Sequence, residues 1–464
     1  LHEQGLWDWA KLPFVQAGFF VGALSLGIVG FLWGVSRIPS GCTPSQRGAT
    51  GSFWWIALVS VLAMTPQLIS WPFWSTDVLL YNLHARIASV YGENPFVTAG
   101  RDLPGLCVDP TSPESGEKQC GSSDECAEGV FCARDPYLEL SPWAKHPASY
   151  GPAAVAFARS AYDRDLGIFG NLVTFRLRAS LCFLAAGLLL GWGVGLRAML
   201  LLLWPPLSWM EVSNGGHFEG VMVLVLVCLF LAWKKRAIRF APEIMGVCAG
   251  ILMLLKITTG LLVVSLLPAM KKSEGIGRTF RMGVLTCLIF GVGYLLVWDA
   301  PHPFGGLMAE GTKTVRSPIH LFRHLLRWIM GADPMAWLSP LVLLAFLAWF
   351  VRSLIRERSV SSPFGFMAYL WMIALCFVFG AFHPWHALVP LILVLLGGDM
   401  DERLPRAVVA LICLAPGVTY GSFLLLRSFD LWVMGGSVLL IFGPVLWIWL
   451  RGWPSPQPSE SGRV

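Results

Sequence analysis

The sequence predicts an all-α polytopic membrane protein with about 13 transmembrane helices, a large external first loop with interfacial helices, and a disulfide-rich insert in that loop. Hydrophobic residues make up 55% of the 464 residues, only 13% are charged, and the mean hydropathy is +0.64. A soluble chain would be near a quarter charged. The net charge of +6 lies mainly in short loops between apolar segments. It therefore indicates membrane orientation and argues against a nucleic-acid partner.

Hydropathy gives the order of the expected spans, several of which are shorter than the ~20 residues that a bilayer requires. They begin at Phe14, Phe53, Leu172, Ala198, Phe218, Pro242, Ile257, Met282, Met335, Phe364, Ala387, Ala407 and Leu431. Basic clusters in short loops, such as Lys234 to Arg239 and Lys271 to Arg278, predict the cytoplasmic side. This orientation puts the loop from about Trp74 to Gly170 and the N-terminus outside, and the C-terminus in the cytoplasm.

The chain is expected to divide into six segments. They are 1–52 (an extra N-terminal helix and cytoplasmic loop), 53–171 (a second span and the large external loop, with a Cys-rich insert at 101–135), 172–298 (a transmembrane core), 299–334 (an external loop with an interfacial helix), 335–450 (C-terminal spans) and 451–464 (a disordered cytoplasmic tail). Because the first residues carry charges and no cleavage site, no cleavable signal peptide is expected.

The external loop opens with a predicted amphipathic helix inside the stretch Ser75 to Phe96. On a 3.6-residue period one face carries Leu79, Leu83, Ile87 and Val90, and the other carries Asp77, Tyr81 and His84. Asp77 could simply cap this helix. Since Ser75 and Thr76 could cap it equally well, the aspartate is free for another role.

A lysine in an apolar segment is the next unusual feature. The segment Pro242 to Met270 has basic clusters at both ends, so it must cross the membrane an even number of times. It is too long for one span and short for two, which predicts a tight hairpin that carries Lys256 to the outer face. Such a lysine usually faces a cavity or an anion; the alternative is a side chain that snorkels to lipid headgroups.

Four cysteines of the insert have the spacing C-x12-C-x5-C-x5-C: Cys107, Cys120, Cys126 and Cys132. The polar residues around them cannot form a core of their own, so two disulfides are expected, in any of three pairings. A zinc site is the alternative, although the usual CxxC pairs are missing. Six other cysteines lie inside spans, and Cys42 lies in a cytoplasmic loop.

Further polar groups are predicted on the outer face, each with a simpler structural alternative. "NGGHFEG" (Asn214 to Gly220) is either a site element or a Gly-rich turn, and "FHPWH" (Phe382 to His386) is either a site element or a proline break with interfacial aromatics. Asp299 and His302 also fall there. "SPIHLFRHLL" spaces two histidines like a zinc pair but reads better as a basic amphipathic helix on lipid phosphates. "DMD" at 399–401 resembles a metal-binding D-x-D but lies on the cytoplasmic side, as a solvated loop.

Taken together, these segments resemble bacterial GT-C glycosyltransferases that take sugars from polyprenyl-phosphate, in particular the mannosyltransferase-like branch. The resemblance covers roughly Phe53 to Gly397. Its motifs are an acidic residue, Tyr, Arg, "NP[YF]" and "YPP" in the first loop, an Asn-Gly-His-acid segment, a lysine hairpin and a Pro-Trp segment. The matching residues are Asp77, Tyr81, Arg86, Asn94-Pro95-Phe96, Tyr150-Gly151-Pro152, Asn214, His217, Glu219, Lys256, Pro384 and Trp385. Gly151 replaces the first proline of "YPP", and the cysteine insert is unusual.

The resemblance implies a GT-C-like fold and sugar transfer on the periplasmic or external face of the plasma membrane. Asp77 would be the catalytic base, and Lys256, Arg86, His383 and His386 would bind the donor phosphate. Acceptor or sugar contacts would come from Tyr81, His84, His217, Glu219, Tyr150 and Trp385. Displacement in one step would invert the anomeric centre, with no cofactor or metal required. The partners would be a polyprenyl-phosphate sugar, a glycan or glycolipid acceptor and membrane lipids.

Two other functions compete with this interpretation. A transporter or flippase of lipid-linked saccharides would explain the many spans and the charges in the membrane. Transporters, however, tend to bury charge near the midplane of paired inverted repeats, and the sequence has no such repeat. A purely structural subunit would explain neither Lys256 nor the external histidines.

Overall fold

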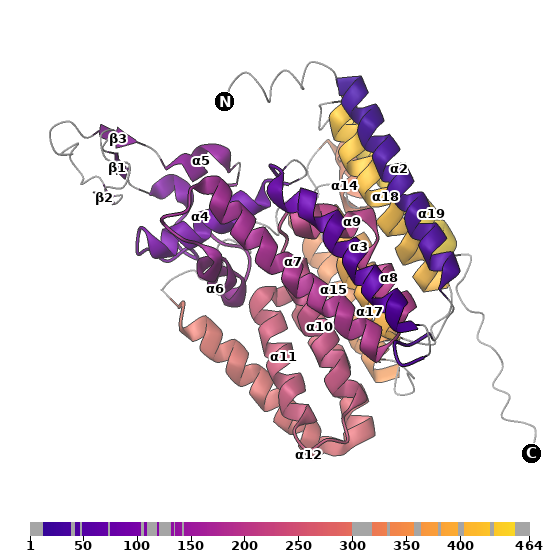
Figure 1. The fold of residues 1–464 in the computed structure, drawn as a ribbon. Helices are drawn as coiled ribbons and strands as arrows, with labels where there is room; N and C mark the ends of the chain where they lie inside the picture. Colours follow the sequence, from indigo (N-terminus) through magenta and orange to yellow (C-terminus); the bar gives the residue numbers. More distant parts are fainter. Residues whose placement is uncertain are drawn as a thin grey trace, which may run out of the picture. The chain divides into compact units, whose positions relative to one another are not determined.

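The computed structural model describes residues 13–38, 42–46, 49–72, 75–103, 106–108, 118–119, 131–133, 135–141, 143–298, 318–331, 335–356, 363–378, 382–397, 403–426 and 431–450. These residues are almost entirely helical, which confirms the predicted all-α class, and they include one small sheet (Figure 1). Several sequence predictions concern residues outside these ranges: Cys120, Cys126, Asp299, His302, the 399–401 motif and the tail 451–464.

The chain forms two compact units. The first, here called the C-terminal unit, comprises Leu1–Leu26, Thr314–Phe350 and Phe364–Val464. The second, here called the site unit, comprises Gly27–Lys313 and Val351–Pro363. All of the predicted site residues belong to the site unit except those of the "FHPWH" segment.

The site unit is built around α7 (Ile168–Gly193), which packs against α3 (Ala49–Ile69), α8 (Leu196–Leu203) and α10 (Glu219–Lys234). The helices α4 (Asp77–Ser89) and α6 (Pro152–Ala161), which lie between α3 and α7 in the chain, pack against each other and against α7 (Figure 1). α6 begins at Pro152. Proline has no N–H, and the first N–H groups of a helix have no acceptor within the helix, so proline suits this position. The loop helices are thus fixed to the apolar helices of the unit.

A sharp bend interrupts the helix that precedes α10. The short α9 (Pro206–Ser208) and the π-helix η3 (Trp209–Asn214) meet α10 at an angle of 113°. Gly216 in this bend has φ +65°, a backbone conformation that residues with a side chain rarely adopt. The bend therefore depends on glycine, and it places His217 and Glu219 at the start of α10.

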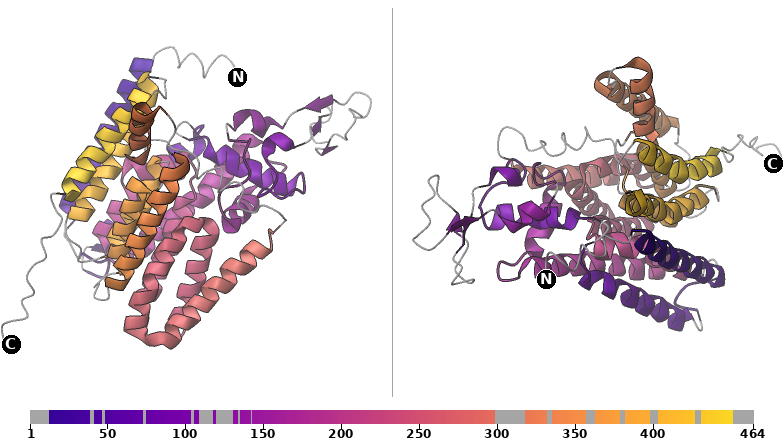
Figure 2. Two further views of the ribbon diagram at one scale, coloured as in Figure 1. Left: turned by 180° about the vertical axis from the view of Figure 1, so that it is seen from behind. Right: turned by 90° about the horizontal axis from the view of Figure 1, so that it is seen from above.

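The helical hairpin predicted around Lys256 is present. α11 (Ala241–Leu255) ends at Lys256, whose backbone is extended, and η4 (Ile257–Thr259) leads into α12 (Gly260–Leu295). A second break at Gly275 (φ +81°) divides α12 into two arms. The second arm packs along α11, as Figures 1 and 2 show, through close approaches at Gly246 and Gly250.

The Cys-rich insert contains three short strands, which the sequence did not predict. β1 (Leu106–Val108) lies between β2 (Lys118–Gln119) and β3 (Phe131–Ala133), and both neighbours run antiparallel to it. The 3-10 turn η2 (Gly100–Asp102) precedes the sheet, and α5 (Pro136–Leu140) follows it.

The C-terminal unit is helical throughout its described residues. Its elements are α14 (Pro318–Met330), α15 (Met335–Arg356) as far as Phe350, α16 (Pro363–Phe377) from Phe364, η5 (Pro384–Ala387), α17 (Leu388–Gly397), α18 (Arg403–Leu426) and α19 (Leu431–Leu450), with the start of α2 (Pro13–Arg37). α14 packs against α19, which also packs against α18. Phe322, Leu325 and Trp328 on α14 are exposed beside Arg323 and Arg327, consistent with the predicted interfacial helix.

Three helical segments among the described residues are long and apolar enough to cross a membrane, namely Ala49–Ile69, Ile168–Gly193 and Ile257–Leu295. Counting the bent pair Pro206–Asn214 and Glu219–Lys234 as one span gives up to 4. These helices indicate a membrane protein, while the fuller set of about 13 spans stays a prediction. The span expected to begin at Ala198 is wrong, because α8 has only 8 residues, about 12 Å of helix.

Candidate active site

Asp77 is the first residue of α4 and is partly exposed. Its backbone N–H donates to Ser75 Oγ at 3.2 Å. Thr76, the N-cap residue, makes no hydrogen bond to the helix through its side chain. A carboxylate at this end is favoured by the helix dipole, and the serine takes over part of the capping.

The rest of α4 corrects the expected amphipathic pattern. Leu79, Leu83 and Ile87 are buried as predicted, but Tyr81 and His84 on the other face are only 1% and 3% exposed. Residues of α6, of α7 and of the bend before α10 pack over that face, which a period within one helix cannot reveal. Tyr81 and His84 are therefore interior residues.

Tyr81 is the centre of a buried polar chain. Its hydroxyl donates to Tyr150 Oη at 3.1 Å and lies 3.3 Å from His217 Nδ1. The rings of Phe175 and Phe218 lie 5.6 and 4.4 Å from the Tyr81 ring between centroids. Burial, followed by the nearby Tyr150, Asp77 and Glu219, raises the pKa of Tyr81 well above its usual value. The hydroxyl thus keeps its proton and acts as a donor.

Glu211 extends this chain and was missed in the sequence. Its Oε2 lies 3.4 Å from His217 Nε2, and both side chains are 0% exposed. The π-helix η3 carries Glu211, and the bend at Gly216 brings His217 back toward it. An isolated acid in the apolar run "WPPLSWMEVS" was the available signal, since acids in such runs are costly unless paired.

Lys256 faces an acid and an aromatic ring. Its Nζ lies 3.1 Å from Glu219 Oε1 and 5.4 Å from the centroid of the Tyr150 ring. The Lys256 side chain is 22% exposed, whereas that of Glu219 is 1% exposed. Glu219 begins α10 and Lys256 follows the end of α11, so each charge opposes the partial charge of its helix end. This arrangement does not match a lysine that merely snorkels to lipid.

Gly151 joins the loop to the hairpin. Its N–H donates to the carbonyl oxygen of Leu255 at 3.1 Å. A Cβ on Gly151 would collide with the carbonyl oxygen of Leu254. A proline here would also lose the hydrogen bond, because it has no N–H. The contact fixes Tyr150 beside Lys256.

Arg86 is a structural residue, which corrects its predicted phosphate role. The buried guanidinium donates to Asp135 Oδ2 at 2.7 Å and to Tyr162 Oη at 2.6 Å. Asp135 also accepts from Tyr91 Oη at 2.8 Å and from the Tyr137 N–H at the start of α5. Arg86 therefore holds the end of the insert against α4.

Two further residues of the resemblance also have structural roles. Asn94 donates to the Val297 carbonyl oxygen at 2.8 Å and accepts from the Phe96 N–H, which ties the loop to the end of α12. Asn214 donates to Ser70 Oγ at 2.8 Å and to the Trp71 carbonyl oxygen. Arg176, which the sequence analysis missed, is 0% exposed and donates to the Ser70 carbonyl oxygen at 2.7 Å. These bonds hold the end of α3 against the bend.

The "FHPWH" residues belong to the C-terminal unit. The ring of His383 stacks on Trp385 at 4.3 Å between centroids, and the His383 N–H donates to His386 Nδ1 at 3.4 Å. Trp385 is buried. The histidines thus contribute to a local turn that starts η5, and their proposed phosphate contacts stay predictions.

The buried chain leaves almost no free space around it. A cavity of about 10 Å³ lies among Tyr81, His84, Tyr150, Val155, Ala158 and Phe218. This volume holds one water molecule at most. Tyr81, His84, His217 and Glu219 therefore lie behind the surface in this conformation, which corrects their predicted direct contacts with a sugar. Asp77, Tyr150 and Lys256 are the partly exposed members of the group.

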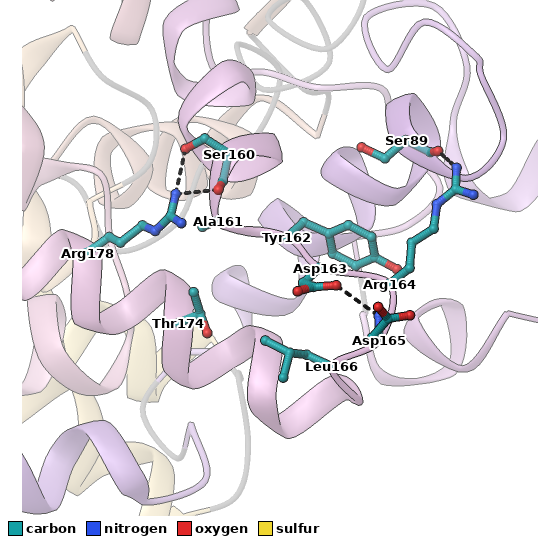
Figure 3. A pocket seen from close by; sticks show the side chains of 10 residues that line it. All are labelled: Ser89, Ser160, Ala161, Tyr162, Asp163, Arg164, Asp165, Leu166, Thr174 and Arg178. Carbon is teal, nitrogen blue, oxygen red and sulfur yellow. Dashed lines mark hydrogen bonds between the residues drawn. The ribbon is translucent and has the colours of Figure 1, made fainter. Parts of the chain in front are cut away.

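A larger cavity, of about 500 Å³, lies where α6 leads into α7 (Figure 3). Asp163, Arg164, Asp165 and Arg178 line it, together with Ser89, Ser160, Ala161, Tyr162, Leu166 and Thr174. Arg178 donates to the Ser160 backbone and hydroxyl, and the Asp165 N–H donates to Asp163 Oδ1 at 3.0 Å. The 10 residues of α6, about 15 Å of helix, separate this cavity from Tyr150.

Within the described residues, no three His, Cys, Asp or Glu side chains gather as a possible metal site. The chain matches no protein-family model, no curated protein and no solved structure.

Proposed function

We propose that the protein is a membrane glycosyltransferase that moves a sugar from a polyprenyl-phosphate donor to a lipid or glycan acceptor on the external face. The observation that carries the proposal is a partly exposed cation beside a tyrosine pair, with a partly exposed acid one helical turn before the first tyrosine. Lys256 lies over the Tyr150 ring, Tyr81 donates to the Tyr150 hydroxyl, and Asp77 begins the helix that carries Tyr81.

Asp77 fits the role of general base. Its carboxylate accepts the proton of an acceptor hydroxyl while the hydroxyl oxygen forms a bond to the anomeric carbon. The bond between that carbon and the donor phosphate breaks, and its electron pair leaves with the polyprenyl phosphate. The displacement inverts the anomeric centre in one step.

Lys256 fits the role of the cation that stabilises the departing phosphate. The electrostatic interaction between an ammonium and a phosphate oxygen strengthens as negative charge develops on that oxygen. Glu219 holds the Lys256 ammonium at 3.1 Å from its own carboxylate oxygen. The lysine is therefore positioned before the donor arrives, which limits the reorganisation required during the reaction.

The buried residues act by positioning this group. The Tyr81 hydroxyl donates to the hydroxyl of Tyr150 and lies beside His217, which in turn lies beside Glu211. We assign Tyr81, His217, Glu211 and Glu219 to support, because none of them is exposed. Substrate contact falls to Asp77, Tyr150 and Lys256.

The cavity between α6 and α7 fits the distal part of a saccharide acceptor. Its carboxylates and guanidinium groups offer both hydrogen-bond acceptors and donors for sugar hydroxyls. A lipid-only acceptor would not require such a polar cavity about one helix length from Tyr150.

A transporter of lipid-linked saccharides is the second candidate. The interrupted helices at Gly216 and Lys256 favour it, because transporters often place binding sites at the ends of broken helices. The partial exposure of Asp77, Tyr150 and Lys256 favours the transferase.

The deciding experiment uses the full-length protein in proteoliposomes that contain radiolabelled polyprenyl-phosphate hexose or pentose and a cell-envelope glycan extract. Transfer of the label to glycan, identified by mass spectrometry of the product, supports the transferase. Movement of intact donor across the bilayer without transfer would overturn it in favour of the transporter.

A further inference from the structure

Two of the four cysteines of the insert lie on the strands of its small sheet. Cys107 lies on the central strand β1 and Cys132 lies on β3. The register of these antiparallel strands makes the two residues direct Cα partners. On the other side of β1, the Cα partner of Cys107 is Lys118.

We propose that Cys107 and Cys132 form a disulfide across β1 and β3. Directly opposed residues of an antiparallel pair have Cα atoms about 4.5–5.5 Å apart, which falls within the disulfide range of about 4.4–6.8 Å. Of the three possible pairings of four cysteines, this choice leaves only Cys120 with Cys126.

The register favours this pair over the other two pairings. Each of those would bond Cys107 to a cysteine that is not its Cα partner, whereas Cys132 lies directly opposite it on β3.

Formation of the bond is a two-electron oxidation. The two thiols lose two protons and two electrons, and one sulfur–sulfur bond forms. A disulfide-bearing oxidoreductase accepts the electrons and protons and becomes a dithiol. Such oxidants act in the periplasm and outside the cell, so the disulfide also assigns the loop that carries Asp77 to that side of the membrane.

Two proteases separate the four cysteines. Cleavage after Arg and Lys and after Glu places Cys107 in 102–114, Cys120 in 119–125, Cys126 in 126–128 and Cys132 in 129–134. The full-length protein is isolated from a host with an oxidising periplasm, its free thiols are blocked at low pH, and the unreduced digest is analysed by mass spectrometry. We expect peptide 102–114 linked to 129–134, and peptide 119–125 linked to 126–128.

Single substitutions provide the matched controls. Cys107→Ser should expose one new alkylatable thiol, at Cys132, whereas Cys120→Ser should expose one at Cys126. A link from peptide 102–114 to either 119–125 or 126–128 would overturn the pairing. Four alkylated thiols in the unreduced wild-type protein would overturn both the disulfide and the assigned side, without bearing on sugar transfer.

Discussion

Lys256 Nζ and Glu219 Oε1 lie 3.1 Å apart, at the point where the end of α11 meets the start of α10. This ion pair joins two helix ends of opposite partial charge. Because Glu219 is buried and Lys256 is partly exposed, the free face of the ammonium is the side that an anion can approach. The positions of both charges are thus set by helix ends.

Replacement of Lys256 tests the phosphate role. We expect Lys256→Met to weaken donor binding by about 10- to 100-fold, since a charge-assisted hydrogen bond is lost. Lys256→Arg should weaken it less, because the charge stays while the geometry changes. Binding of radiolabelled donor to the purified protein measures both. Lys145→Met, at an exposed lysine between α5 and α6, is the matched control. Unchanged donor binding in Lys256→Met would indicate a lipid-facing lysine instead.

Replacement of Asp77 tests the base. Asp77→Asn keeps the size of the side chain and should lower sugar transfer by about 10²- to 10⁴-fold, because the proton acceptor is removed. Donor binding should change little, so the variant should lose transfer rate while it keeps its affinity for the donor. Asp102→Asn, at an exposed carboxylate of the loop, should retain full activity. Near-normal transfer by purified Asp77→Asn would remove the assignment.

His84 should make stability depend on pH. Burial lowers the pKa of His84 from 6.5 to about 4, so the folded protein holds the ring neutral while the unfolded chain protonates it below pH 6.5. The neutral ring therefore adds roughly 3 kcal/mol to the free energy of unfolding above pH 6.5, and this stabilisation is lost as the pH falls toward 4. Thermal denaturation in detergent between pH 7 and 4.5 measures the loss. His84→Asn should make the melting temperature depend less on pH. If the melting temperatures of wild type and variant fall equally with pH, His84 is not the origin of the effect.

Gly151 should tolerate no side chain. Gly151→Ala places a Cβ against the Leu254 carbonyl, and we expect a loss of about 1–3 kcal/mol in stability from the forced backbone shift. The melting temperature in detergent should fall, and transfer should fall with it because Tyr150 moves. Gly167→Ala provides the comparison, since the Cβ there would meet open space. Equal melting temperatures for the two variants would show that the junction is more adaptable than its geometry indicates.

The sequence was sufficient to predict features whose physical signal is local. Basic clusters at both ends of an apolar segment predicted the break at Lys256, and the structure has it. The solvent-exposed face expected for α4 was wrong, because residues of α6, α7 and the bend before α10, all distant in sequence, bury Tyr81 and His84. Arg86 looked available for phosphate until Asp135, 49 residues away, was seen to bind it. Long-range partners of this kind leave no periodic trace in the chain.

The clasp between Arg86 and Asp135 has a consequence for the segment that precedes it. The N–H of Arg101 donates to the Ala144 carbonyl oxygen before the sheet, and Asp135 is bound by α4 directly after it. The two ends of the insert are thus anchored at Ala144 and at Arg86 of α4. In polymer terms the chain between these anchors is a closed loop, whose doubling in length costs only about 0.6 kcal/mol. Provided that Asp135 is kept, the sequence between the anchors can therefore change in length at a small cost in free energy, without moving Asp77 or Tyr150.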